Sequence, residues 1–253
     1  MNPLVLEKKA NAFRNQHGIG SDDAIHLKSL LYKLNVLTVF RPLAQGISGM
    51  AIKTSSPSGG SSCFVLINSN KTLGHQHFTI CHELYHLYVQ ADFEHRVCFA
   101  GKFEKKDPEE YNADVFAAHL LLPENGVKAL IPDDELRRDK IKLATLLKIE
   151  QYFSCSRAAL LYRLKNLDII SESKRTEFKS NIKRGAVQLG FTTGIYESGN
   201  HHQVIGDYGT LARELFDKER ISESHYLSLL QDLGMNPNEI QQLETLTDDG
   251  DNG

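Results

Sequence analysis

The chain has 253 residues, of which 41% are hydrophobic, and its formal net charge is −3. It can bury a substantial core as one large or two smaller globular domains. No apolar stretch approaches the 18 residues of a membrane-spanning helix and no secretion leader opens the chain, so we expect a soluble, cytoplasmic protein. The four cysteines are widely spaced without a C-x-x-C pair, which excludes a disulfide framework and a zinc knuckle: Cys63, Cys81, Cys98 and Cys155.

The first part of the chain predicts two helices. One spans residues 4–17 and ends at Gly18. The second is expected to begin at Ser21, whose side chain is a good helix cap. Its apolar residues recur at helical spacing and form one stripe, made of Ala24, Leu27, Leu30, Leu31 and Leu34.

A small sheet is predicted next. The β-rich segments are residues 35–40, 49–53 and 63–67. The last two are joined by residues 55–62, a serine- and glycine-rich stretch that predicts a mobile, turn-forming loop.

An H-E-L-Y-H motif runs from His82 to His86 inside the apolar segment 78–88. On a helix, histidines four residues apart are separated by roughly 6 Å of rise and about 40° of rotation, so both rings can bind one ion. Glu83 then lies close enough to take a proton from a water on that ion. The alternative is a pair of core histidines bonded to backbone carbonyls. The buried helical context favours a metal.

The predicted order of elements is two helices, a small sheet and then the helix with the motif. This is the order of an α+β metallopeptidase core.

A catalytic zinc takes three protein ligands and leaves one position for water. Residues 91–108 predict a loop, and residues 109–122 predict a helix that could supply the third ligand. Glu110 and Asp114 share a face of that helix. Glu110 is therefore our candidate ligand, and Asp114 is expected to accept the second N–H of a zinc-bound histidine. The alternative for this acidic pair is a solvated helix N-terminus.

Asp92 competes for the same role. It follows His86 by six residues, the spacing of the extended HExxHxxGxxH/D pattern, but Val89 stands where that pattern needs a glycine to turn the chain. Three further residues are weaker candidates because of their position in the loop or on the helix: His95, His119 and Glu109.

In combination, several segments between about residues 5 and 170 resemble the ImmA/IrrE family of metallopeptidases. They are residues 47–49, 64–68, 78–86 and 110–123. The resemblance implies a zincin-like fold and a gluzincin-like site with Glu110 as third ligand. Two departures stand out: Asn112 replaces a glutamate that family members often carry, and His75 replaces an arginine before the motif helix.

The resemblance also implies narrow intracellular proteolysis. Family members resemble proteases that cut a helix-turn-helix repressor, often encoded beside them in mobile elements, stress regulons or toxin–antitoxin pairs. The expected partner is therefore a helix-turn-helix repressor or antitoxin that serves as substrate.

The residues themselves predict metal-assisted peptide hydrolysis. Zinc, or alternatively Mn²⁺, polarises a water, and Glu83 removes its proton and passes it to the leaving amine. Four side chains are candidates to stabilise the oxyanion, and the sequence does not choose among them: Tyr85, Tyr88, His75 and His77.

A basic helical region is predicted after the metallopeptidase domain. Helices at residues 140–153 and 157–166 flank a short turn, and Ser156 caps the second. Residues 137–184 carry 13 Lys or Arg against 5 Asp or Glu, although the whole chain is negative. Such helices can dock a partner or bind DNA, for which the candidate contacts are Arg157, Arg163 and Lys165. DNA binding is the less favoured of the two because no base-reading side chains are evident.

We therefore predict three regions: a zincin-like metallopeptidase domain at residues 1–131, a helix-turn-helix-like region at 132–185, and a C-terminal region at 186–253. In the last, residues 185–203 are glycine-rich and read as a β segment, with His201 and His202 in a loop. One helix is capped by Ser222 and closed by Gly234, another opens at residues 236–237, and the tail at 247–253 is expected to be disordered.

The competing hypothesis is a regulator that does not cleave. In that case the basic helices bind a repressor or DNA and the metal site is vestigial. An intact Glu83 argues against it, because a purely structural metal site has no use for a base.

Overall fold

The computed structural model describes residues 1–55, 61–104 and 106–236. The first half contains four helices and four strands: α1 (Pro3–Gln16), α2 (Leu27–Lys33), β1 (Val36–Arg41), β2 (Gly49–Ser55), β3 (Ser61–Asn68), α3 (Leu73–Tyr88), β4 (His95–Cys98) and α4 (Pro108–Leu121). The described part of the second half is mostly helical: α5 (Glu124–Ala129), α6 (Leu143–Phe153), α7 (Arg157–Asn166), α8 (Glu172–Glu177), α9 (Ile182–Gln188), β5 (Val204–Ile205), α10 (Tyr208–Asp217) and α11 (Glu223–Asp232), with short 3₁₀ turns at Asp133–Glu135 and Gly194–Tyr196.

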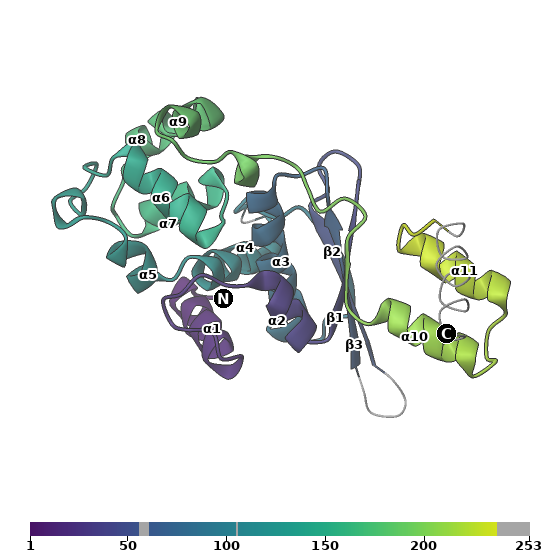
Figure 1. Ribbon diagram of the computed structural model, residues 1–253. Helices are drawn as coiled ribbons and strands as arrows, with labels where there is room; N and C mark the ends of the chain where they lie inside the picture. The colour runs from purple at the N-terminus through teal and green to yellow at the C-terminus, as the bar shows by residue number, and fades with distance from the viewer. Residues whose placement is uncertain (56–60, 105, 237–253) are drawn as a thin grey trace.

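The strands form one mixed sheet in the order β4-β2-β3-β1-β5. β1 and β3 are parallel, and β2 pairs antiparallel with both β3 and β4. Helices α1 to α4 lie on one side of this sheet (Figure 1). Helices packed against one face of a largely antiparallel sheet define an α+β fold, so the predicted fold class is confirmed.

Residue spacing explains these elements. Successive residues of β1 alternate between buried and half-buried positions, as one covered face of a sheet requires. α3 is buried over nearly its whole surface, because the sheet covers one side and α4 the other. Gly49 at the start of β2 permits this close contact: a Cβ atom there would lie 2.8 Å from Glu83 Oε1 and 2.9 Å from the carbonyl oxygen of Leu66.

Helices α6 and α7 belong to the same hydrophobic core as α1 to α4. Leu146 and Ile149 of α6, and Leu160 and Leu164 of α7, are fully buried in that core. The predicted boundary at residue 131 therefore falls between helices that share a core, and the three-region division stays a prediction.

The prediction that the second helix begins at Ser21 is wrong. α2 begins at Leu27 because the preceding segment folds around the buried Arg14, whose guanidinium donates to the carbonyl oxygens of Gly20 and Asp23.

Two further expectations need correction. The stretch predicted as loop at residues 91–108 contains β4, which pairs with β2 over Gly49–Ile52. The glycine-rich segment 185–203 holds the end of α9 and a 3₁₀ turn instead of a β segment, and the short strand β5 follows it. His201 and His202 do lie in a turn, as predicted.

The C-terminal helices α10 and α11 form a hairpin with a small core of its own, made of Ala212, Tyr226 and Leu230. Figure 1 shows it on the side of the sheet away from α1 to α4. Ser222 caps α11 and Gly234 follows it with φ +82°, as predicted, whereas α10 was not anticipated. Most of the predicted loop at 55–62, the helix opening at residues 236–237 and the tail at 247–253 lie outside the described residues. Within the described part of the chain, no helix is both long and apolar enough to cross a bilayer.

Candidate metal centre

The two motif histidines meet on α3. His82 and His86 are fully buried, and their Nε2 atoms lie 3.2 Å apart. The other ring nitrogen of each histidine has its own partner: Asp114 Oδ1 lies 2.9 Å from His82 Nδ1, and Gln90 Oε1 contacts His86 Nδ1. Both Nε2 atoms therefore face a common point.

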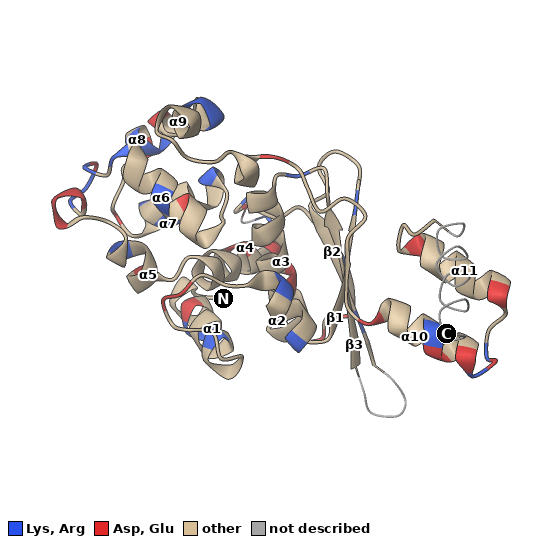
Figure 2. Cartoon of the chain, in the orientation of Figure 1, with Lys and Arg blue, Asp and Glu red and all other residues tan. Residues whose placement is uncertain are grey.

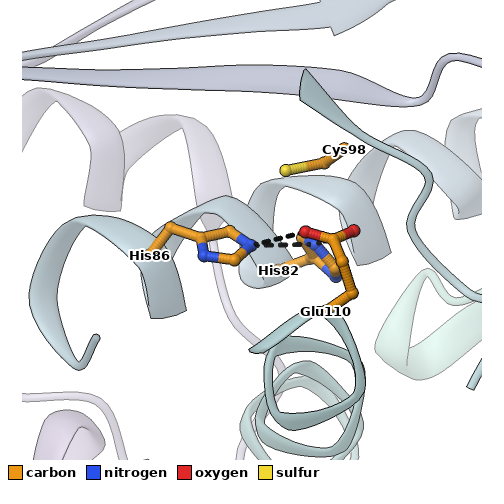
Figure 3. Close-up of side chains that lie close together, drawn as sticks. All are labelled: His82, His86, Cys98 and Glu110. Atoms are coloured by element: carbon orange, nitrogen blue, oxygen red, sulfur yellow. Dashed lines mark hydrogen bonds and ion pairs between the residues drawn. The ribbon is translucent and has the colours of Figure 1, made fainter. Parts of the chain in front are cut away.

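Glu110 reaches this point from α4. Its Oε2 atom lies 3.5 Å from His82 Nε2, and its Oε1 atom lies 3.3 Å from His86 Nε2 (Figure 3). Ligands about 2.1 Å from a tetrahedral ion are separated from one another by about 3.4 Å. The three side chains therefore have the mutual spacing of ligands to a single ion, and α4 brings to the histidines the glutamate that the sequence selected.

Asp114 holds His82 in place, in the position that the sequence predicted for it. Its two carboxylate oxygens also accept the backbone N–H groups of Gly101 and Phe103, each at 2.7 Å. Burial alone would lower the pKa of His82, but the hydrogen bonds to Asp114 and Glu110 outweigh it and raise that pKa to about 10. For Glu110, burial acts to raise the pKa, and the two histidines overcome it and lower the pKa well below its usual range.

Glu83, the single glutamate of α3, is fully buried. Its Oε1 atom has no hydrogen-bond partner among the described residues. Burial raises the pKa of this carboxyl to about 7. Such a group exchanges protons near neutral pH, as a general base requires. Gly49 of β2 lies against the unpartnered oxygen and leaves room for it, because a Cβ atom at this position would come within 2.8 Å of Oε1.

Two residues of β4 complete the surroundings of the cluster, and the sequence analysis missed both roles. Cys98 Sγ lies 3.3 Å from Glu83 Oε2 and belongs to a group of ligand atoms from His82, His86 and Glu110 that all lie within 4.8 Å of one another. Arg96 Nε lies 3.6 Å from Glu110 Oε1. The apolar residues at 97–99 could have indicated a strand. β4 is only four residues long, which is too short to show an alternating pattern.

The structure engages all four candidate oxyanion stabilisers with other groups. The Tyr85 hydroxyl donates to Glu109 Oε2 at 2.6 Å. Tyr88 points toward the Leu34 carbonyl, and His77 bonds the Ser154 carbonyl, both away from the cluster. His75 Nε2 lies 3.0 Å from the Ser48 hydroxyl, and burial lowers the pKa of His75 to about 4.

The competing ligands lie elsewhere. Asp92 is exposed in a turn with φ +50°, and His95 is exposed on β4. His119 faces Glu7 of α1 at 3.5 Å, and Glu109 bonds Tyr85. These four residues therefore do not join the cluster.

The basic helices differ from the sequence prediction. Arg157 is 4% exposed and bonds Glu150 and the Phe178 carbonyl, and Arg163 is 3% exposed and bonds the Leu122 carbonyl. Burial of both side chains contradicts their assignment as contacts for DNA or a partner. Lys165 is exposed and pairs with Glu172. Figure 2 shows further Lys and Arg on α8 and α9, of which Lys183 and Arg184 are exposed.

The residues present fit a divalent ion. Two imidazoles and a carboxylate are the donor set of a catalytic zinc. In addition, buried oxygens of Glu83 and Glu110 lack hydrogen-bond partners within the described chain, and a bound ion and its water would satisfy them.

Comparison with known proteins agrees with this chemistry. A family model for peptidase family M78, described as the IrrE N-terminal-like domain, matches residues 32–165. The matched segment runs from α2 to α7 and contains every residue of the cluster. No curated protein matches the sequence. Because the family match covers more than half of the chain, the protein belongs to the IrrE N-terminal-like peptidase family, M78, and is a metallopeptidase.

Proposed function

We propose that the protein is a zinc-dependent endopeptidase of narrow specificity, acting in the cytoplasm on a helix-turn-helix repressor or antitoxin. Family membership supports a metallopeptidase. The four cysteines are free thiols, which is typical of a reducing compartment.

One observation carries the proposal: the buried Glu83 adjoins a cluster of three metal-ligating side chains. The facing atoms of His82, His86 and Glu110 lie 3.2 to 3.5 Å apart. Glu83 Oε2 lies 3.3 Å from Cys98 Sγ, which is within 4.8 Å of these ligand atoms. A structural metal site has no use for an additional buried carboxylate with an unpartnered oxygen. The carboxylate and the ligands together are the minimum set for hydrolysis of a peptide bond.

The chain supplies the acid–base steps. His82, His86 and Glu110 would hold the ion, which when bound polarises a water and the substrate carbonyl. Glu83 takes the proton of the attacking water and delivers it to the leaving amine. Asp114 keeps the His82 ring oriented through the cycle, because it bonds Nδ1 while two backbone N–H groups fix its own carboxylate.

A peptide substrate has an edge to bind. β4 is the terminal strand of the sheet, and its Arg96 and Cys98 face the cluster. Beside them, Val97 is 47% exposed and Phe99 is 42% exposed. An extended peptide can pair with such an edge through backbone hydrogen bonds, and apolar side chains nearby then contribute selectivity.

The choice of a helix-turn-helix repressor rests on the resemblance to the ImmA/IrrE family. DNA binding by a helix-turn-helix needs an exposed recognition helix that can enter a groove. α7 would be that helix, and most of its residues are buried, so this alternative is less favoured. Docking of a protein partner on α8 and α9 remains compatible with proteolysis and supplies a second contact area for a substrate.

The experiment is co-expression of the chain with a helix-turn-helix protein encoded beside it. We expect the full-length neighbour to disappear with the unmutated chain and to persist with Glu83→Gln. Glutamine keeps the size of glutamate but cannot accept a proton, so zinc content measured on the purified variant should stay at one per chain.

Glu94→Gln is the matched control, because Glu94 is exposed just before β4 and its substitution should leave cleavage unchanged. Cleavage that survives Glu83→Gln would refute the assigned base. A neighbour that persists with every variant would refute the substrate class.

A further inference from the structure

Cys98 occupies a position that the mechanism above does not explain. It is fully buried on β4, and its sulfur lies among the ligand atoms of His82, His86 and Glu110. Figure 3 shows the thiol pointing over the space between His86 and Glu110 from the side of the sheet, opposite to the approach of Glu110 from α4. The cluster thus contains four potential ligands instead of three.

The Cys98 sulfur also lies next to Glu83, the proposed general base. Sγ is 3.3 Å from Glu83 Oε2. An attacking water would have to lie within about 2.6–3.2 Å of the same carboxylate. A thiol and a water therefore compete for one place beside Glu83. Thiolate is moreover a preferred ligand of zinc.

We propose that Cys98 is a fourth metal ligand that closes the site in this conformation, so that the peptidase is latent until β4 moves. The inference rests on the proposed function, because it needs a metal at His82, His86 and Glu110. A site with four protein ligands has no open position for water, which is the arrangement of structural zinc sites. Binding of the metal releases the thiol proton to solvent.

The strand that carries Cys98 is suited to release it. β4 is four residues long, lies at the end of the sheet and pairs with β2 alone among the described strands. A partner that pairs with the outer edge of β4, or contacts the exposed Val97 and Phe99, acts on the strand that holds the thiol. Substrate docking and opening of the metal site are then coupled.

The test loads the full-length metal-free protein with one equivalent of Co²⁺ and records its absorption spectrum. Thiolate bound to Co²⁺ gives an intense near-ultraviolet charge-transfer band, which nitrogen and oxygen ligands do not give. We expect the band in the unmutated protein and its loss in Cys98→Ser, with Co²⁺ still bound. The affinity for zinc should fall by at least about tenfold.

Cys63→Ser is the matched control, because Cys63 lies on β3 outside the cluster and should leave the band unchanged. Cys98→Ala serves as a second variant if the serine disturbs folding, which circular dichroism reports. Co²⁺ bound without the band, or a band that survives both Cys98 variants, overturns the inference and leaves the proposed function intact. Failure of the unmutated protein to bind Co²⁺ overturns both.

Discussion

At the scale of single residues, Asp114 decides how well the site is organised. It fixes His82 through Nδ1 and ties the chain after β4 to α4 through the N–H groups of Gly101 and Phe103. Asp114→Asn removes the charge that favours the correct His82 tautomer. We expect zinc affinity to fall about 10- to 100-fold, measured by competition with a chromophoric chelator.

Asp92→Asn is the control for this prediction, because Asp92 is exposed outside the cluster. Its affinity for zinc should equal that of the unmutated protein. An equal loss in both variants would contradict the ligand set of His82, His86 and Glu110.

Gly49 sets the distance between β2 and the base. A methyl group at this position would meet Glu83 Oε1 and Thr79 Cγ2 at 2.8 Å and a backbone oxygen at 2.9 Å. Because the backbone cannot yield cheaply, Gly49→Ala should lower the free energy of unfolding by about 1–3 kcal/mol. Chemical denaturation measures this loss. Gly194→Ala, where the added group meets nothing within 4 Å, should leave stability nearly unchanged, and equal effects would contradict the steric argument.

At the scale of elements, the basic helices serve structure more than recognition. Arg157 of α7 forms a buried ion pair with Glu150 of α6, and Tyr196 donates to the same carboxylate at 2.5 Å. Burial raises the pKa of Glu150, while Arg157 opposes that rise. Arg157→Ala leaves this carboxylate buried without its counter-charge and should cost about 3–5 kcal/mol of unfolding free energy in a denaturant titration.

Lys165→Ala on the same helix is the comparison. Its ion pair with Glu172 is exposed to solvent, and exposed pairs contribute little. The midpoint of unfolding should therefore stay close to that of the unmutated protein. A small effect of Arg157→Ala would show that α7 does not depend on this ion pair.

At the scale of the whole molecule, one core unites the sheet with α1 to α7, whereas α10 and α11 pack chiefly on each other. The hairpin is tied to the sheet by a bond from Arg41 to the Asp232 carbonyl. Truncation after Gly206 keeps β5 and should preserve binding of one zinc per chain, with a small decrease in the thermal midpoint. Zinc content and scanning calorimetry test this, and loss of metal binding would show that the hairpin supports the site.

The sequence by itself determined the local geometry of the site. Helical periodicity places His82 and His86 one turn apart and Glu110 on the same face as Asp114, whatever surrounds them. Helix ends followed local chemistry as well, as at Ser156 and Ser222, whose side chains accept the predicted backbone N–H groups. These features depend on residues within one or two turns of each other, so spacing alone predicts them.

The tertiary structure alone decided what is buried and what meets across the sheet. Arg157 and Arg163 look like surface charges in a basic stretch, but neighbouring elements supply Glu150 and the Leu122 carbonyl as internal partners. Cys98 carries no local signal of its role, because β4 is too short to show a period and its partner β2 lies more than forty residues earlier. Such contacts depend on long-range pairing of the chain, which no local pattern of residues encodes.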